Sequence, residues 1–210
     1  MTRNQLHGKT FEDWIKACGR FPGSADAGRS PTAGFDIEPR FDRKMELPTS
    51  IKTTGNNIVG LSDARAFWAI DHDIRMIVGS YKQNPDRKTF ATIHEFILSA
   101  EILLKLRGDI SVAEVEALHQ GISMANFPAG GHVGARIWAR EQNACLKLRA
   151  GQVVLNPKID SKRQRRVQCS IALIALIDVS IEGESYVCHR ERMGDVALPY
   201  EQFSTRREFG

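Results

Sequence analysis

The plainest chemistry in this sequence comes from an acid and a lysine in two neighbouring short segments. Asp36 lies in Gly34–Glu38 (GFDIE), and Lys52 lies in Thr49–Thr54 (TSIKTT). Both segments have the composition of strands and are bounded by Pro or Gly, which predicts an antiparallel hairpin over residues 33–54 with an irregular connection. Such a hairpin would bring the carboxylate and the ammonium group to the same part of a sheet.

Side chains two positions apart share a face of a strand, so Glu38 would accompany Asp36 and Ser50 would accompany Lys52. A carboxylate pair is what Mg²⁺, which prefers oxygen ligands, requires. A lysine beside the metal could orient the attacking water, help to deprotonate it, or stabilise charge on a phosphoryl oxygen. The alternative is structural, because solvated strand lysines and turn acids are abundant in all proteins.

The segments around this hairpin predict an α/β fold with a central mixed β-sheet flanked by helices, forming a single domain over residues 1–210. Apolar residues recur at helical spacing in three segments: Lys9–Cys18, Ser111–Ile122 and His132–Leu148. Further strands are expected at Asn57–Ile70, Arg75–Tyr81, Thr89–Leu98, Gln152–Leu155 and Arg166–Asp178. Glu12, on the first helix, could supply another carboxylate.

A Glu-bearing helix (GKTFEDW), a Gly-x-Asp strand (GFDIE) and an apolar strand ending in Ile-Lys (TSIKTTG) follow one another in the first quarter of the chain. This layout resembles the PD-(D/E)xK nuclease superfamily. The resemblance implies a restriction endonuclease-like mixed sheet flanked by helices. It also implies Mg²⁺-dependent cleavage of phosphodiester bonds, frequently by a type II restriction enzyme.

Carried over by position, the resemblance makes Asp36 the metal-binding acid and Lys52 the catalytic lysine. Glu12 matches the helix glutamate that some members use. The sequence departs from the family pattern at two positions. Phe35 replaces the proline before the aspartate, and Ser50 occupies the catalytic position where the family's second carboxylate belongs.

The departure at Ser50 leaves the second metal ligand open. Glu38, on the face of Asp36, and Glu12, on the preceding helix, are two candidates. In the third arrangement one Mg²⁺ is held through the Asp36 carboxylate and the Ile51 carbonyl.

The charge distribution points to an anionic partner. The chain has 29 Lys and Arg against 25 Asp and Glu, a net charge of +4. The stretch 158–166 (KIDSKRQRR) has five Lys and Arg and one Asp, so its own net charge equals the net charge of the whole chain. Strand alternation would place Lys162, Gln164, Arg166 and Gln168 on one face and Arg163 and Arg165 on the other. The alternative is a basic edge strand that protects against aggregation.

Arg and Lys neutralise phosphates, and Arg and Gln read guanine and adenine edges in the major groove. The segment 156–168 is therefore the expected DNA-contacting segment. Its candidate residues are Lys158, Lys162, Arg163, Gln164, Arg165, Arg166 and Gln168.

Other classes of protein fit the sequence less well. The longest apolar run, Ser170–Ile181, is too short to span a membrane and contains Asp178. The first twenty residues lack a basic-then-apolar signal pattern. The four cysteines are scattered without zinc-binding spacing, which favours a reducing cytoplasm.

The sequence thus predicts a cytoplasmic, Mg²⁺-dependent endonuclease of double-stranded DNA, sequence-specific and belonging to a restriction system. A homodimer would match the two-fold symmetry of a palindromic site. Two alternatives stay open. One is a repair, recombination or phage nuclease that cuts by DNA structure. The other is a catalytically inactive DNA-binding protein, which Ser50 motivates.

Overall fold

The computed structural model describes residues 3–25, 34–42, 44–83, 87–193, 196–197 and 201–203. Contacts between Cα atoms divide the chain into two compact units. Unit 1 comprises residues 1–59, 73–99 and 176–210, and unit 2 comprises residues 60–72 and 100–175. The chain crosses between the units four times: within strand β2 (Ile58–Asp63), between residues 72 and 73, between residues 99 and 100, and within helix α6 (Leu173–Glu182).

Unit 1 is built on a mixed five-stranded sheet. Its strands are β1 (Thr49–Thr54), β3 (Ile74–Gln83), β4 (Arg87–Leu98) and β10 (Glu201–Phe203) in this order, and β7 (Tyr186–His189) also pairs with β4. β1 and β3 are parallel, whereas β4 is antiparallel to β3, β7 and β10. The remaining short elements of unit 1 are the 3-10 helix η1 (Pro39–Phe41) and the pair β8 (Arg192–Met193) and β9 (Val196–Ala197).

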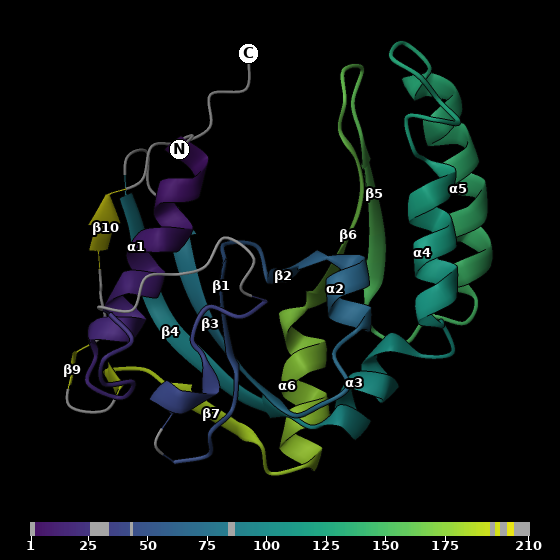
Figure 1. Cartoon of the computed structure of the whole chain (residues 1–210). Coiled ribbons are helices and arrows are strands. Elements are labelled where there is room, and N and C mark those ends of the chain that lie inside the picture. The colour runs from purple at the N-terminus through teal and green to yellow at the C-terminus, as the bar shows by residue number, and fades with distance from the viewer. Residues whose placement is uncertain are drawn as a thin grey trace. The chain divides into compact units, whose positions relative to one another are not determined.

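Helix α1 (Arg3–Ala17) covers one face of this sheet (Figure 1). Phe11 and Ile15 are fully buried and pack with Ile51, Ile77, Phe90 and Ile93 in one apolar cluster. The helix comes so close that a Cβ atom at Gly79 of β3 would lie 2.6 Å from the ring of Phe11. The apolar face of α1 therefore fixes which face of β1 carries Ile51.

Unit 2 combines a three-stranded sheet with four helices. The strands are ordered β2, β6 (Arg165–Ala172) and β5 (Val154–Ile159), and β5 and β6 form an antiparallel hairpin. The helices are α2 (Ala64–Trp68), α3 (Ala100–Arg107), α4 (Val112–Gly121) and α5 (His132–Lys147). α5 packs beside β5, and α2 and α4 pack beside β6.

The α/β class and the mixed sheet flanked by helices are confirmed, and so are most elements. The helices expected at Lys9–Cys18, Ser111–Ile122 and His132–Leu148 correspond to α1, α4 and α5, and β1 has the expected bounds. α4 begins with a capping box in which Ser111 and Glu114 bond each other's backbone. That residues 1–210 form one domain stays a prediction.

The strand expected at Gln152–Leu155 is β5, which begins at Val154 and continues to Ile159. Three other strand predictions are wrong in part. Gly34–Glu38 forms only one β-bridge, Ile37 to Thr49, because Pro39 has no N–H to donate and starts η1. The second half of Asn57–Ile70 is helix α2, whose first turn is capped by the side chain of Asp63.

The third error is the apolar run Arg166–Asp178, which is strand β6 only as far as Ala172 and then becomes α6. Periodicity cannot distinguish a buried strand from a buried helix in a run that is apolar throughout. Helix α3 was not predicted. No helix in the described part of the chain is long and apolar enough to cross a membrane.

Candidate active site and basic groove

The candidate active site lies along the outer edge of β1, in unit 1. Ile37 and Thr49 exchange backbone hydrogen bonds of 3.0 and 2.9 Å, which fixes the segment around Asp36 beside this strand. The Asp36 carboxylate then accepts a hydrogen bond from the backbone N–H of Ile51 at 2.6 Å. The carboxylate is thereby held against the strand by the main chain.

Lys52 is brought to this carboxylate as the sequence predicted. Its Nζ lies 3.6 Å from Asp36 Oδ2, and the two side chains are 19% and 8% exposed. These fractions leave the pair sheltered but still reachable from solvent. Asp36 and Lys52 thus form one site although only a single β-bridge joins their segments.

The carbonyl of Ile51 faces the same edge. In an extended strand the N–H and the C=O of one residue point to the same side, so the Ile51 carbonyl lies on the side of Asp36. The Ile51 side chain is buried in the cluster beneath α1. Ser50 and Lys52, its neighbours in the strand, therefore lie on the opposite face of the sheet.

The other candidate ligands have partners of their own. Glu38 is 53% exposed and pairs with Arg40 at 3.0 Å, and Glu12 pairs along α1 with Lys16 at 2.6 Å. Ser50 is half-buried in β1. Within the described ranges, no group of three or more His, Cys, Asp or Glu residues is arranged to hold a metal ion.

The basic segment of unit 2 is a hairpin loop followed by a strand. The alternation expected from Lys162 is wrong up to Gln164, because these residues form the loop between β5 and β6. Asp160 Oδ1 accepts hydrogen bonds from the backbone N–H groups of Lys162 and Gln164, at 2.9 and 2.8 Å. These bonds lower the pKa of Asp160 and stabilise the turn.

Neighbouring arginines in this hairpin have different environments. Arg165 donates hydrogen bonds to the carbonyls of Asp160, Gln164 and Phe127 at 2.6, 3.1 and 3.4 Å. Arg166 is exposed and lies directly across the hairpin from Lys158, which is also exposed. Gln168 lies two positions further on the same face, opposite Asn156. Lys162 and Arg163 are exposed in the loop.

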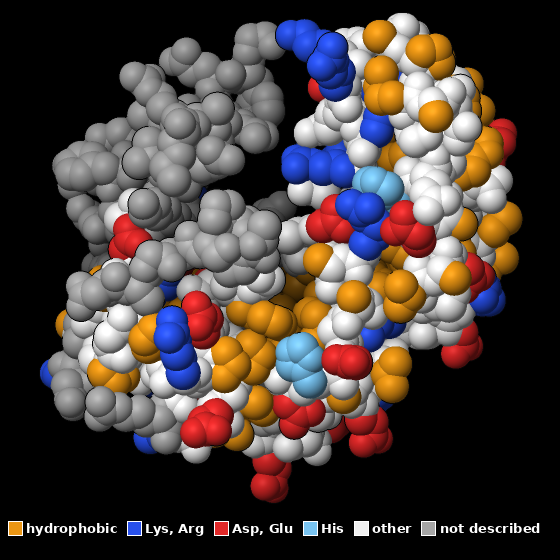
Figure 2. All heavy atoms as spheres, in the orientation of Figure 1, with side chains coloured by type: hydrophobic (Ala, Val, Ile, Leu, Met, Phe, Trp, Pro, Cys, Tyr) orange, Lys and Arg blue, Asp and Glu red, His pale blue; other side chains and the backbone are white. Residues whose placement is uncertain are grey.

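Figure 2 shows Lys and Arg side chains grouped around the free end of this hairpin. Unit 2 has twelve Lys and Arg against eight Asp and Glu, which equals the net +4, whereas the rest of the chain has seventeen of each. The local excess of positive charge inferred from the sequence thus lies in unit 2.

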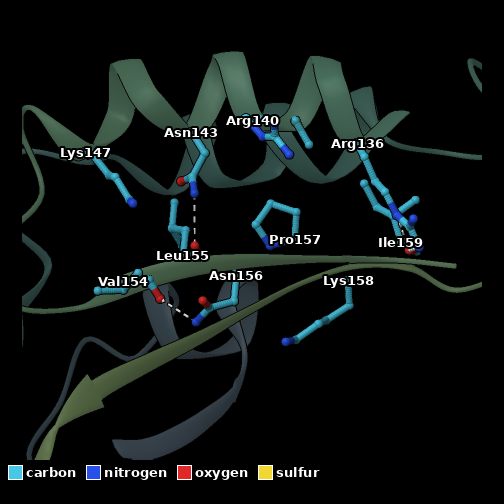
Figure 3. Close-up of a pocket in the computed structure, with 11 residues that line it drawn as sticks. Arg136, Arg140, Asn143, Lys147, Val154, Leu155, Asn156, Pro157, Lys158 and Ile159 are labelled. Carbon is cyan, nitrogen blue, oxygen red and sulfur yellow. Dashed lines mark hydrogen bonds between the residues drawn. The ribbon is translucent and has the colours of Figure 1, made fainter. Parts of the chain in front are cut away.

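A second basic surface, which the sequence reasoning missed, lies between α5 and β5 (Figure 3). Arg136, Arg140, Asn143 and Lys147 recur at helical spacing and line a pocket with residues 154–159 of β5. We call this pocket the basic groove. Its signal in the sequence was the four polar positions on one face of the predicted helix His132–Leu148, which no motif marked.

A buried ion cluster in unit 1 was also unforeseen. Arg75, 1% exposed, lies 2.5 Å from Asp42 and 3.0 Å from Glu95. Glu95 also pairs with Arg20 and, at 3.0 Å, with His189. Burial alone would raise the pKa of Glu95, but the hydrogen bond with His189 and the charges of Arg20 and Arg75 outweigh this effect and lower that pKa. The mutual pairing of these charges indicates a structural role.

Comparisons with protein-family models, curated proteins and solved structures found no match for this chain.

Proposed function

We propose that the protein is a Mg²⁺-dependent endonuclease that hydrolyses phosphodiester bonds of double-stranded DNA. The proposal depends on one observation above the others: Lys52 Nζ lies 3.6 Å from an Asp36 carboxylate that the backbone of Ile51 holds in place. An acid and a lysine fixed at a sheltered strand edge are the pair that the PD-(D/E)xK resemblance requires. The mixed sheet flanked by helices supports the same family.

The residues at this edge fit a magnesium ion. Mg²⁺ usually keeps several waters and is held by one or two carboxylates together with phosphate oxygens of the substrate. The Asp36 carboxylate and the Ile51 carbonyl are two oxygen ligands on one side of β1. Bound there, Mg²⁺ would supply Lewis acidity at the scissile phosphate. Glu38 and Glu12 are the candidates for a second carboxylate.

The residues of the chain have separate tasks in this proposal. Asp36 would hold the metal, and the hydrogen bond that it accepts from the Ile51 N–H keeps the carboxylate oriented. The Lys52 ammonium group orients the attacking water and stabilises negative charge that develops on a phosphoryl oxygen. Ser50, on the same face of β1 as Lys52, contributes a hydroxyl where the family has a carboxylate.

The exposed lysines and arginines of the β5–β6 hairpin support double-stranded DNA as the substrate. Lys158 and Arg166 face each other across the two strands, and Lys162 and Arg163 are exposed in the loop. Sequence-specific cutting within a restriction system would follow if Arg166 or Gln168 reads base edges. A homodimer would place one site on each strand of a palindrome.

The test is incubation of the purified full-length chain with unmethylated phage DNA, with and without Mg²⁺. We expect discrete Mg²⁺-dependent fragments, which Asp36→Asn and Lys52→Ala both abolish. Lys44→Ala, an exposed lysine outside the site, is the matched control and should cut normally. A smear or nicking would indicate a nuclease that recognises DNA structure, and end mapping of discrete fragments would give the site.

A second candidate, favoured by Ser50, is a DNA-binding protein without catalytic activity. Without the second carboxylate the site has one acidic ligand at the family's paired positions. This candidate predicts binding of duplex DNA, measured by gel shift, with no cleavage at any concentration of Mg²⁺ or Mn²⁺. Cleavage that requires both Asp36 and Lys52 would exclude it.

A further inference from the structure

The basic groove runs along the outer edge of the hairpin in unit 2. β5 is the edge strand of its sheet, and its consecutive residues 154–159 line the groove from both faces. Two side chains of α5 satisfy carbonyls of this edge: Asn143 Nδ2 bonds Leu155 at 3.1 Å, and Arg136 bonds Ile159 at 2.8 and 3.0 Å. The walls are therefore held together by specific hydrogen bonds, and the groove is preformed.

The charges in the groove lack counter-charges. The lining includes Arg136, Arg140, Lys147 and Lys158 and contains no acid. In the part of the chain that the structure describes, Arg140, Lys147 and Lys158 form no ion pair. Between His132 and Ser170 there are nine Lys and Arg against two Asp and Glu.

The position of Lys158 is a second sign that this surface binds an anion. It lies directly opposite Arg166 in the hairpin register. Like charges that face each other across two strands destabilise a sheet, so the hairpin tolerates an unfavourable pair. An anion bound beside them would remove that repulsion.

The dimensions favour an extended anion over a single small one. Arg140 and Lys147 are seven residues apart on α5, which at about 1.5 Å per residue is about 10 Å along the helix. One phosphate group could reach only one or two of these cations. The groove itself has a volume of about 390 Å³ and is open along the edge of one strand, so it suits one chain of phosphates better than a whole duplex.

We propose that the basic groove binds the phosphodiester backbone of a single nucleic-acid strand. Arg140, Lys147 and Lys158 would contact phosphates, while the hydrogen bonds of Asn143 and Arg136 hold the two walls together. The groove would secure one strand beside the hairpin that contacts the duplex. The inference deepens the proposed function by locating where a strand is held, but it lies wholly in unit 2 and requires no cleavage.

Fluorescence anisotropy with a labelled single-stranded oligonucleotide tests this proposal, using the full-length chain in EDTA so that no cleavage occurs. The variants are Arg140→Ala and Lys147→Ala, alone and combined. Lys105→Ala is the matched control, because Lys105, like Lys147, is an exposed lysine in the last turn of a helix of unit 2. Circular dichroism checks that every variant is folded.

We expect each substitution in the groove to weaken binding and to reduce the slope of log Kobs against log salt by about 0.7 for a single strand. The combined variant should lose about twice that slope, and Lys105→Ala should lose none. A slope equal to that of Lys105→Ala would overturn the proposal. So would mononucleotide or inorganic phosphate that competes as strongly as the oligonucleotide, since the groove would then bind one phosphate.

These outcomes are distinguishable from failure of the proposed function. If the chain never cleaves DNA but the groove variants change the salt slope, only the nuclease proposal fails. If cleavage depends on Asp36 and the groove variants bind normally, only the groove proposal fails.

Discussion

Two regions of this protein, the ion cluster with the candidate site in unit 1 and the basic surfaces in unit 2, hold their charged side chains in opposite ways. In unit 1, Arg75 is buried between Asp42 and Glu95, and Lys52 lies against Asp36. In unit 2, exposed lysines and arginines line the basic groove and the β5–β6 hairpin, and few acidic residues lie near them in the sequence. Paired and sheltered charges fix structure, whereas exposed charges of one sign are available to bind an anionic partner. Four experiments test this difference.

The largest effect is expected from removing the central cation of the ion cluster. Arg75→Met leaves Asp42 and Glu95 buried without their shared partner and should lower the free energy of unfolding by about 3–5 kcal/mol. Lys147→Ala, which removes an exposed charge from unit 2, should change it by less than about 0.5 kcal/mol. Urea unfolding followed by circular dichroism measures both. Equal losses would show that the charges of the two units do not differ in this way.

Asp36→Asn should separate catalysis from binding. The amide keeps an oxygen that can accept the Ile51 hydrogen bond but loses the charge that holds Mg²⁺, so we expect cleavage to fall by at least about a hundredfold. DNA binding in EDTA should stay unchanged, since it belongs to unit 2. Asp13→Asn, at an exposed acid on α1, is the control for charge. If Asp36→Asn abolished DNA binding together with cleavage, the assignment of cleavage to unit 1 and of binding to unit 2 would be wrong.

A smaller effect is expected from acidification. Because the hydrogen bond with His189 and the charges of Arg20 and Arg75 outweigh burial and lower the pKa of Glu95, its ionised form stabilises the folded state at pH values above its pKa in the unfolded chain. That stabilisation is lost as the pH falls through the lower folded pKa. Melting temperatures measured across this acidic range should fall less steeply for Glu95→Gln than for the unchanged chain. Glu101→Gln, at an exposed acid, should reproduce the unchanged profile.

The two sites also differ in how far the sequence could predict them. Asp36 and Lys52 were found because each lies in a short segment with recognisable boundaries, and a single hairpin suffices to join them. Their segments meet even though Gly34–Glu38 is no strand, because Ile37 alone makes the necessary bridge. Local order along the chain was enough for this site.

The basic groove could not be predicted in this way. Arg140 and Lys147 become a binding surface only because α5 packs beside β5, and no local pattern fixes which face of a helix meets which strand edge. The ion cluster depended likewise on tertiary register, which places Glu95 of β4 opposite Ile77 and near Arg75 of β3. The strand prediction for the second half of Arg166–Asp178 was wrong for another reason, because a run that is apolar throughout is compatible with a strand and with a helix.

The smallest expected effect separates two adjacent arginines of the hairpin. Arg166 is exposed opposite Lys158, so Arg166→Ala should reduce the slope of log Kobs against log salt for duplex DNA by about 0.9, the equivalent of one phosphate contact. Arg165 donates its hydrogen bonds to loop carbonyls, so Arg165→Ala should leave that slope unchanged and lower stability by about 1 kcal/mol. Salt titrations of binding and urea unfolding of both variants measure the two quantities. If both substitutions lower the slope equally, Arg165 contacts the DNA despite its hydrogen bonds, and paired charges in unit 2 would then no longer differ in role from unpaired ones.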